Sequence, residues 1–91
     1  MELPQRLTVP SEVMARQVGD ETVLLDLASG NYFGLDEVGA RIWQLLVDGK
    51  APAEICEILL VEYDTSREML ENDVGRLLKE LAAHGLVISN S

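Results

Sequence analysis

The order of apolar and polar residues divides the chain into a first part with strand periodicity and a second part with helical periodicity. Up to about Gln17, apolar residues alternate with polar ones, and Pro10 interrupts the alternation. This pattern predicts a strand or extended arm with an edge or bulge at the proline. A turn is expected at residues 19–20, and a second strand over residues 22–27. Gly30 and Asn31 then favour a hairpin connection into a short strand over residues 32–35.

The strand predicted over residues 22–27 carries apolar side chains on both faces. Side chains alternate across a strand, so Val23, Leu25 and Leu27 share one face, and Leu24 and Asp26 share the other.

Apolar residues at spacings of three and four predict three helices after residue 36. Asp36 is the expected N-cap of the first helix, which ends at Gly49. Pro52 suits the first turn of the second helix, which ends near residues 63–64. Residues expected to be buried by the first two helices are Val38, Ile42, Trp43, Leu45, Leu46, Ile55, Ile58 and Leu59.

The third helix has the clearest signals at its two ends. Thr65 and Glu68 form a capping-box pattern, and Gly85 stands where a C-terminal glycine belongs. Residues 86–88 are apolar and can add a short strand or cap the core. The core side of this helix is expected to consist of Leu70, Val74, Leu78 and Leu81.

Strands followed by three helices and a short strand predict an α+β fold. We expect a three-stranded antiparallel sheet packed on three helices, with a short C-terminal strand, which is also the winged-helix plan. A chain of 91 residues is expected to form a single domain over residues 1–91.

Charge and composition narrow the function. The formal net charge is −9, and the seven basic residues are scattered, whereas nucleic-acid-binding domains show a Lys/Arg footprint. We therefore expect no nucleic acid partner. The absence of a signal-like or membrane-spanning apolar run predicts a cytoplasmic protein with no membrane partner.

The residue types of catalytic and metal sites are sparse. Cys56 cannot form an internal disulfide and is expected to lie in the core. His84, just before Gly85, suits a capping or solvated position at a helix C-terminus. One Cys and one His cannot make a structural zinc site, and no glycine is followed by the Lys-Ser/Thr of a phosphate loop. We expect a protein that is not an enzyme and has no metal and no cofactor.

The hairpin itself is therefore the candidate functional surface. A small sheet leaves an edge strand to which an extended peptide can pair. Strand alternation means that Tyr32 and Phe33 point to opposite sides, so one is expected in the core and the other partly exposed. Three functions stay open from these residues: a peptide-binding protein, a winged-helix transcription regulator and an oligomerising module.

The chain carries short motifs in a characteristic order, and the similarity that they indicate covers about residues 13–88. The motifs are Leu24-Leu25-Asp26-Leu27, Gly30-Asn31-Tyr32-Phe33-Gly34-Leu35, Val38-Gly39, Ile42-Trp43, Asp48-Gly49, Ile55, Tyr63-Asp64, Asp73-Val74, Leu77-Leu78, Leu81 and Gly85-Leu86. In these motifs the chain resembles the PqqD-like family, the recognition elements that capture leader peptides of ribosomally made precursors (RiPPs). Its aromatic hairpin is most like the free-standing proteins of lasso-peptide biosynthesis. The resemblance implies a winged-helix-like fold that binds a precursor leader peptide as an added strand.

The resemblance also implies partners and a site. A separate leader peptidase would act on the tethered precursor in lasso systems, and a radical enzyme in quinone-cofactor systems. The groove would lie between the hairpin and the third helix, with an apolar pocket at Tyr32 or Phe33 and Leu77. If the chain binds a leader in this way, a proline at Phe33 is expected to remove a strand amide and disrupt leader binding, with harm to folding as the effect to control for. The full set of expected leader-binding residues is Asn31, Tyr32, Phe33, Gly34, Leu35, Asp73, Arg76, Leu77 and Glu80.

Overall fold

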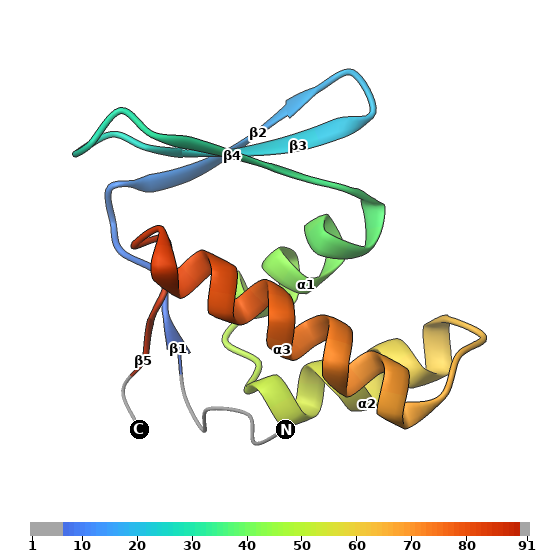
Figure 1. Ribbon diagram of the computed structural model, residues 1–91. Helices are drawn as coiled ribbons and strands as arrows, with labels where there is room; N and C mark the ends of the chain where they lie inside the picture. Colours follow the sequence, from blue (N-terminus) through green and yellow to red (C-terminus); the bar gives the residue numbers. More distant parts are fainter. Residues whose placement is uncertain (1–6, 90–91) are drawn as a thin grey trace.

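The computed structural model describes residues 7–89 (Figure 1), so residues 1–6 and 90–91 of the expected 1–91 domain lie outside it. The elements in chain order are β1 (Leu7–Thr8), β2 (Val13–Val18), β3 (Glu21–Asp26), β4 (Tyr32–Leu35), α1 (Glu37–Val47), α2 (Pro52–Glu62), α3 (Arg67–Ala83) and β5 (Ile88–Ser89).

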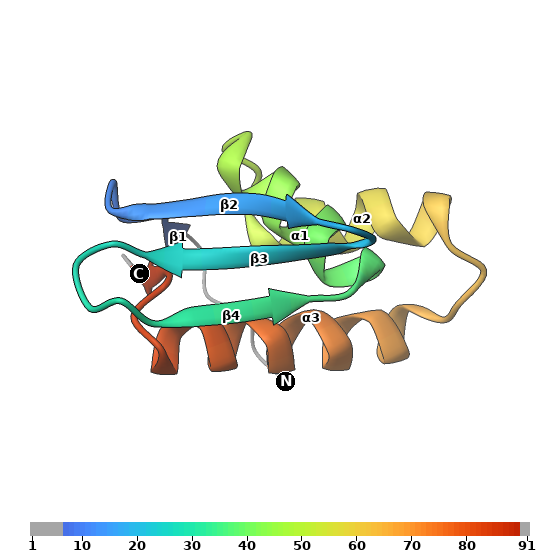
Figure 2. The same cartoon turned by 90° about the horizontal axis from the view of Figure 1, so that it is seen from above.

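The main sheet is antiparallel, with the strand order β2-β3-β4, and a second small sheet pairs β1 with β5. The three helices lie on one side of the main sheet, and its other side is uncovered by the described elements (Figures 1 and 2). The α+β prediction is confirmed: a three-stranded antiparallel sheet packs on three helices. The predicted C-terminal strand forms at residues 88–89 and pairs with β1.

Pro10 has a different role from the one predicted. It is neither an edge nor a bulge of one long strand, because β1 and β2 belong to different sheets. The Val13 N–H donates to the Pro10 carbonyl at 3.1 Å, so the chain turns here and crosses from the small sheet to the main one.

The strand register assigns each side chain to a face of the sheet. Leu24 pairs with Phe33 across β3 and β4, and Leu24 is fully buried, so this row faces the helices. The neighbouring row contains Leu25 and Tyr32 and faces away from the helices. The core therefore takes the face with Leu24, and not the face of Val23 and Leu25.

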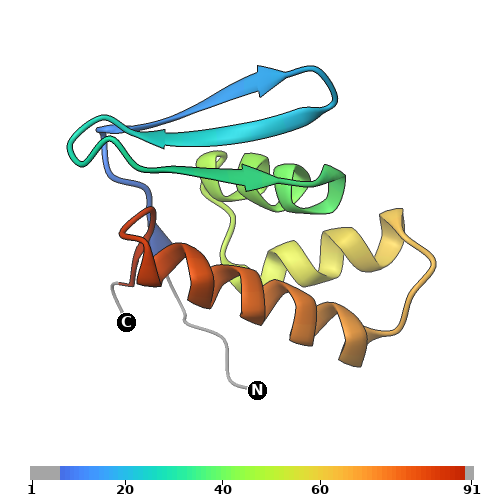
Figure 3. The same ribbon diagram turned by 45° about the horizontal axis from the view of Figure 1, so that its top comes forward.

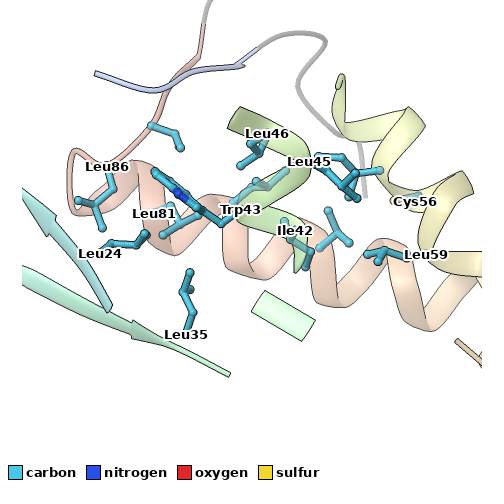
Figure 4. Close-up of a cluster of buried hydrophobic side chains, with 14 of the residues drawn as sticks. Leu24, Leu35, Ile42, Trp43, Leu45, Leu46, Cys56, Leu59, Leu81 and Leu86 are labelled. Carbon is cyan, nitrogen blue, oxygen red and sulfur yellow. The ribbon is translucent and has the colours of Figure 1, made fainter. Parts of the chain in front are cut away.

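The hydrophobic core lies between the sheet and the helices and continues among the three helices, where Cys56 and Leu59 pack (Figure 4). Trp43 is 4% exposed, which confirms its predicted place in the core, and Cys56 is also buried. The third helix buries the four predicted residues. The largest fully buried side chains are Leu24, Ile42, Ile55, Leu59, Leu81, Leu86 and Val74.

Most of the predicted helix ends are confirmed. The Asp36 carboxylate accepts a hydrogen bond from the Gly39 N–H at 2.7 Å and caps α1. Gly85 follows α3 with φ +73°, and its N–H donates to the Ala82 carbonyl while the Leu86 N–H donates to the Leu81 carbonyl. This pair of bonds is a Schellman motif, which requires the left-handed conformation that glycine adopts without strain.

The predicted cap of α3 is wrong by one residue. Ser66 is the N-cap, and its hydroxyl accepts from the Met69 N–H at 3.2 Å. The Thr65 N–H donates to the Tyr63 carbonyl, so Thr65 belongs to the turn after α2. The capping box of Thr65 with Glu68 therefore does not form.

Candidate functional site

Figures 2 and 3 show the edge strand β4 on the same flank of the molecule as α3. A groove lies between these two elements, with the start of α1 as its floor. Its cavity volume is about 340 Å³. The residues that line it are Phe33, Gly34, Leu35, Asp36, Val38, Gly39, Ile42, Asp73, Arg76, Leu77 and Glu80.

Apolar side chains form the inner wall of the groove. Leu35 and Ile42 are buried, whereas Phe33, Val38 and Leu77 are half-buried and pack on the core beneath them. These three therefore present apolar surface to an occupant, while their other sides stay fixed by the core. Such a wall can take apolar side chains of a ligand without rearranging the fold.

Gly39 allows the close approach of α1 and β4. A Cβ at this position would lie 3.3 Å from Leu35 Cδ2 and 3.2 Å from the Asp36 carboxylate, which is tighter than ordinary contact. A side chain at Gly39 would require Leu35 or Asp36 to shift by a few tenths of an ångström.

Charged groups form the α3 side of the groove. Arg76 contacts Asp73 at 3.4 Å, one helical turn apart, and both side chains are exposed. Glu80 lies one turn further along the helix. Asp36 at the other wall is engaged as the α1 cap. The rim is polar and net acidic, above an apolar floor.

Backbone N–H and C=O groups of β4 face β3 and the open edge of the sheet alternately. The Asp26 N–H donates to the Asn31 carbonyl at 2.9 Å, which sets the alternation of the β3–β4 ladder. The N–H and C=O of Phe33 and Leu35 therefore face β3, and those of Tyr32 and Gly34 face outward. Within residues 7–89, no strand pairs with this edge.

This alternation of backbone groups corrects one expectation from the sequence, the effect of a proline at Phe33. The strand amide that a proline at Phe33 removes belongs to the ladder with β3, and not to the open edge where a leader would pair. The proline would break the sheet and not the binding edge. The edge amides are those of Tyr32 and Gly34.

Phe33 contacts a residue that sequence reasoning did not place in the site. The Phe33 and His84 ring centroids are 5.3 Å apart, with an interplanar angle of 54°. His84 is the C-cap of α3, as predicted, and its N–H donates to the Glu80 carbonyl at 3.1 Å. The aromatic pair joins the end of α3 to β4 and fixes the Phe33 ring beside the groove.

Seven of the nine predicted site residues line the groove, and two do not. Asn31 lies in the hairpin turn, where its N–H donates to the Ser29 hydroxyl at 3.2 Å. The Tyr32 side chain is 78% exposed on the far side of the sheet. Phe33 is the half-buried partner, so the prediction of one packed and one exposed aromatic is confirmed. The seven are Phe33, Gly34, Leu35, Asp73, Arg76, Leu77 and Glu80.

The α1 residues of the groove were missed. Asp36, Val38 and Ile42 were assigned to the cap and the core of the first helix, which they also serve. Only Asp36 separates the end of β4 from the start of α1. The first turn of the helix therefore lies beside the edge strand, and this adjacency in the sequence could have indicated that α1 residues line the groove. Its consequence is that one segment, residues 33–42, supplies more than half of the groove.

Three further findings concern the rest of the described chain. None of its helices is both long and apolar enough to cross a membrane. No cluster of three potential metal ligands occurs between residues 7 and 89. Burial raises the pKa of the Cys56 thiol, as expected for a core cysteine.

Comparison with protein families matches residues 21–87 to the family described as Coenzyme PQQ synthesis protein D (PqqD). The match spans most of the chain, from β3 to the end of the core after α3. The chain belongs to the PqqD family. The family resemblance drawn from the hairpin and helix motifs is therefore confirmed. Among proteins with curated descriptions, none matches this PqqD-family chain.

Two solved structures are similar to this PqqD-family chain in sequence and in fold. One, described as TbiB1 in complex with the TbiA(beta) leader peptide, is 40% identical, with a TM-score of 0.85 over 92% of this chain and 98% of that one. The other, described as lasso peptide synthetase B1 complexed with the leader peptide, is 32% identical. Its TM-score is 0.83 over 91% of this chain and 98% of that chain.

Proposed function

We propose that this PqqD-family chain binds the leader segment of a ribosomally made precursor peptide as an added strand on β4. The observation that carries the proposal is the open edge of β4 beside an apolar groove that α3 closes. Main-chain hydrogen bonds along an exposed edge give affinity, and pockets for alternate side chains give specificity. Both similar solved structures are described as leader-peptide complexes.

The outward groups of Tyr32 and Gly34 define the pairing. A leader strand would exchange hydrogen bonds with these two residues, so leader side chains opposite Phe33 and Leu35 would point toward the helices. Every second leader side chain would therefore enter the groove. Apolar side chains are expected there, because Phe33 and Leu77 present apolar surface.

The α3 rim supplies polar contacts. Asp73 and Arg76 form a mutual ion pair that is exposed to solvent, so either can exchange its partner for a leader group at small cost. Together with Glu80, they would set the register of the leader along the helix. Asn31 lies in the hairpin turn outside the residues that line the groove, so we assign it no contact with the leader side chains that enter the groove.

The proposed action is to raise effective concentration, without a chemical step on this chain. A leader held by the chain brings the attached precursor to a separate maturation enzyme, and tethering can raise the effective affinity by roughly 10²–10⁴-fold. We infer a leader peptidase as that enzyme, because the similar structure at 32% identity is described as a lasso peptide synthetase B1. The family description also supports a second candidate, a peptide chaperone for the radical enzyme of quinone-cofactor synthesis. Both would act in the cytoplasm.

A DNA-binding role receives little support from the charges. A winged-helix reader needs free cations on its recognition helix. On α3, Arg67 is paired with Glu57 and Arg76 with Asp73. The helix as a whole carries more acidic than basic residues, so phosphate contacts would be opposed.

The proposal is tested by an isotope-edited NMR titration of the chain with the leader of the precursor encoded in the same gene cluster. Saturable shifts of the Tyr32 and Gly34 amides and of α3 around Leu77 are expected. A scrambled leader of equal composition is the control and should leave these signals in place. Absence of saturable shifts at high excess of the true leader, with the protein folded, would contradict the proposal.

A further inference from the structure

Glu80 lines the groove with a charge that the rest of the described chain does not balance. Asp36 caps α1, and Asp73 and Arg76 form an ion pair with each other. The Glu80 side chain is exposed, and within residues 7–89 its carboxylate takes part in no hydrogen bond or ion pair. An occupant of the groove therefore meets one negative charge that is free to pair with it.

The end of α3 adds to this negative potential. Glu80 lies near the C-terminus of the helix, where the backbone carbonyls form the negative end of the helix dipole. The last turn of α3 contains no basic residue. The imidazole of His84, the C-cap, packs on the Phe33 ring and makes no ion pair with Glu80. This end of the groove therefore favours a cation from outside the described chain.

The same end of the groove also presents apolar surface. Phe33 lies beside the end of α3, because its ring centroid is 5.3 Å from that of His84. Leu77 precedes Glu80 by three residues, so the two side chains are neighbours on the helix surface. Phe33 and Leu77 are both half-buried and line the groove with Glu80. We call Phe33, Leu77 and Glu80 the end subsite.

A lysine or arginine side chain matches both properties of the end subsite. Its methylene stem covers apolar surface while its charged head keeps polar contacts. A purely apolar side chain would cover Phe33 and Leu77, but it would also remove water from the Glu80 carboxylate without giving it a partner. A carboxylate side chain would meet a like charge. The end subsite therefore distinguishes occupants by charge as well as by size.

Strand pairing indicates which leader residue reaches the end subsite. In the proposed complex, the leader residue directly opposite Phe33 directs its side chain toward the helices. Figure 2 shows that β4 and α3 run in opposite directions, so this residue lies at the C-terminal end of α3. The leader residue opposite Leu35 also points inward but lies further from that end.

From these features we infer that the end subsite binds a Lys or Arg side chain of the leader, at the residue opposite Phe33, and that Glu80 determines this specificity. The inference rests on the proposed function for the identity of the added strand. It also gives the leader a defined register, because sliding the strand by two residues would move the cation away from Glu80.

The test uses three synthetic leader peptides that carry Lys, Gln or Glu at the residue opposite Phe33 and are otherwise identical. Cross-strand NOEs between the bound native leader and β4 identify that residue beforehand. The full chain is compared as wild type, Glu80→Lys and Glu68→Lys. Glu68→Lys is the matched control, because Glu68 is an exposed carboxylate on α3 outside the groove. Fluorescence anisotropy gives the affinities, and circular dichroism verifies that each variant is folded.

We expect wild type and Glu68→Lys to bind the Lys peptide about tenfold more tightly than the Glu peptide, with the Gln peptide between them. Glu80→Lys should reverse this order, and higher salt should reduce the differences. An unchanged order in folded Glu80→Lys would overturn the inference, as would equal affinities of the wild type for the three peptides. A reversal shared by Glu68→Lys would show an effect of net charge and would also overturn it. Failure of the wild type to bind the native leader would instead contradict the proposed function.

Discussion

Gly34→Pro is the sharpest perturbation of the proposed binding edge. The Gly34 N–H faces outward from β4 and takes no part in the ladder with β3, so a proline here leaves the sheet intact. A Cβ at Gly34 would find only the Glu21 carboxylate nearby, at 3.9 Å, and Gly34 has no positive φ. The substitution should therefore fold and lose one edge donor.

The expected loss follows from a single hydrogen bond. Removing the donor costs a net bond of about 0.5–1.5 kcal/mol, or about 1–3 kcal/mol where the leader carbonyl is left buried without a partner. The second range corresponds to roughly 5- to 150-fold in Kd. Gly34→Ala keeps the N–H, and its effect on Kd should stay below about threefold because the site has room.

Isothermal titration with the leader peptide measures the three affinities, and circular dichroism verifies that each variant is folded. Phe33→Pro serves as a contrast and should unfold, because its N–H bonds to β3. Leader binding by folded Gly34→Pro at wild-type strength would refute strand pairing along β4. Equal losses in Gly34→Pro and Gly34→Ala would show a steric effect and would also refute the role of the amide.

Three other outcomes are expected. Leu77 is half-buried in the groove. Leu77→Glu should weaken leader binding by about tenfold or more in titration calorimetry, because a carboxylate replaces apolar surface. A folded variant with unchanged affinity would exclude α3 as a wall of the binding site. The Cys56 thiol is buried and its pKa is raised by burial, so a chromogenic thiol reagent should modify it only as fast as the protein opens; rapid labelling of folded protein would contradict that placement. The Arg41 guanidinium donates two hydrogen bonds to Glu62 and lowers the pKa of that carboxyl. The contribution of the Arg41–Glu62 ion pair to stability is therefore complete above the unfolded-state pKa of Glu62, and it is lost as pH falls through the lower folded-state pKa. Urea unfolding from neutral to acid pH should show a small, salt-sensitive dependence that Arg41→Gln removes; an identical acid dependence in that variant would assign the effect to other groups.

Elements fixed by local chemistry could be predicted from the sequence. Asp36, Gly49 and Gly85 end or begin helices where they were expected, and the strand at residues 32–35 has the predicted bounds. Each depends on a side chain or glycine acting within a few residues. The predicted N-cap of α3 was wrong because the adjacent hydroxyl residues Thr65 and Ser66 both suit an N-cap. Only the turn after α2 decides between them.

Features that depend on distant segments were beyond the sequence. Residues 22–27 are apolar on both faces, so periodicity could not show that Leu24 faces the core. Strand alternation separated Tyr32 from Phe33 but could not say which enters the groove. The choice follows from where the helices lie, and the edge amides follow from the pairing of Asp26 with Asn31. The family resemblance indicated that the groove lies between β4 and α3. Leader binding by the residues of these two elements stays a prediction.

The two walls of the groove have a consequence for folding energetics. Phe33 on β4 and Leu77 on α3 are separated along the chain by α1 and α2, so the groove exists only in the folded chain that brings them together. A ligand that binds only the folded state raises the free energy of unfolding by RT ln(1 + [L]/Kd), about 2.7 kcal/mol at a hundredfold excess over Kd. The peptide would thus protect the whole chain against heat and proteases, and the cellular lifetime of the protein would increase with the supply of its precursor.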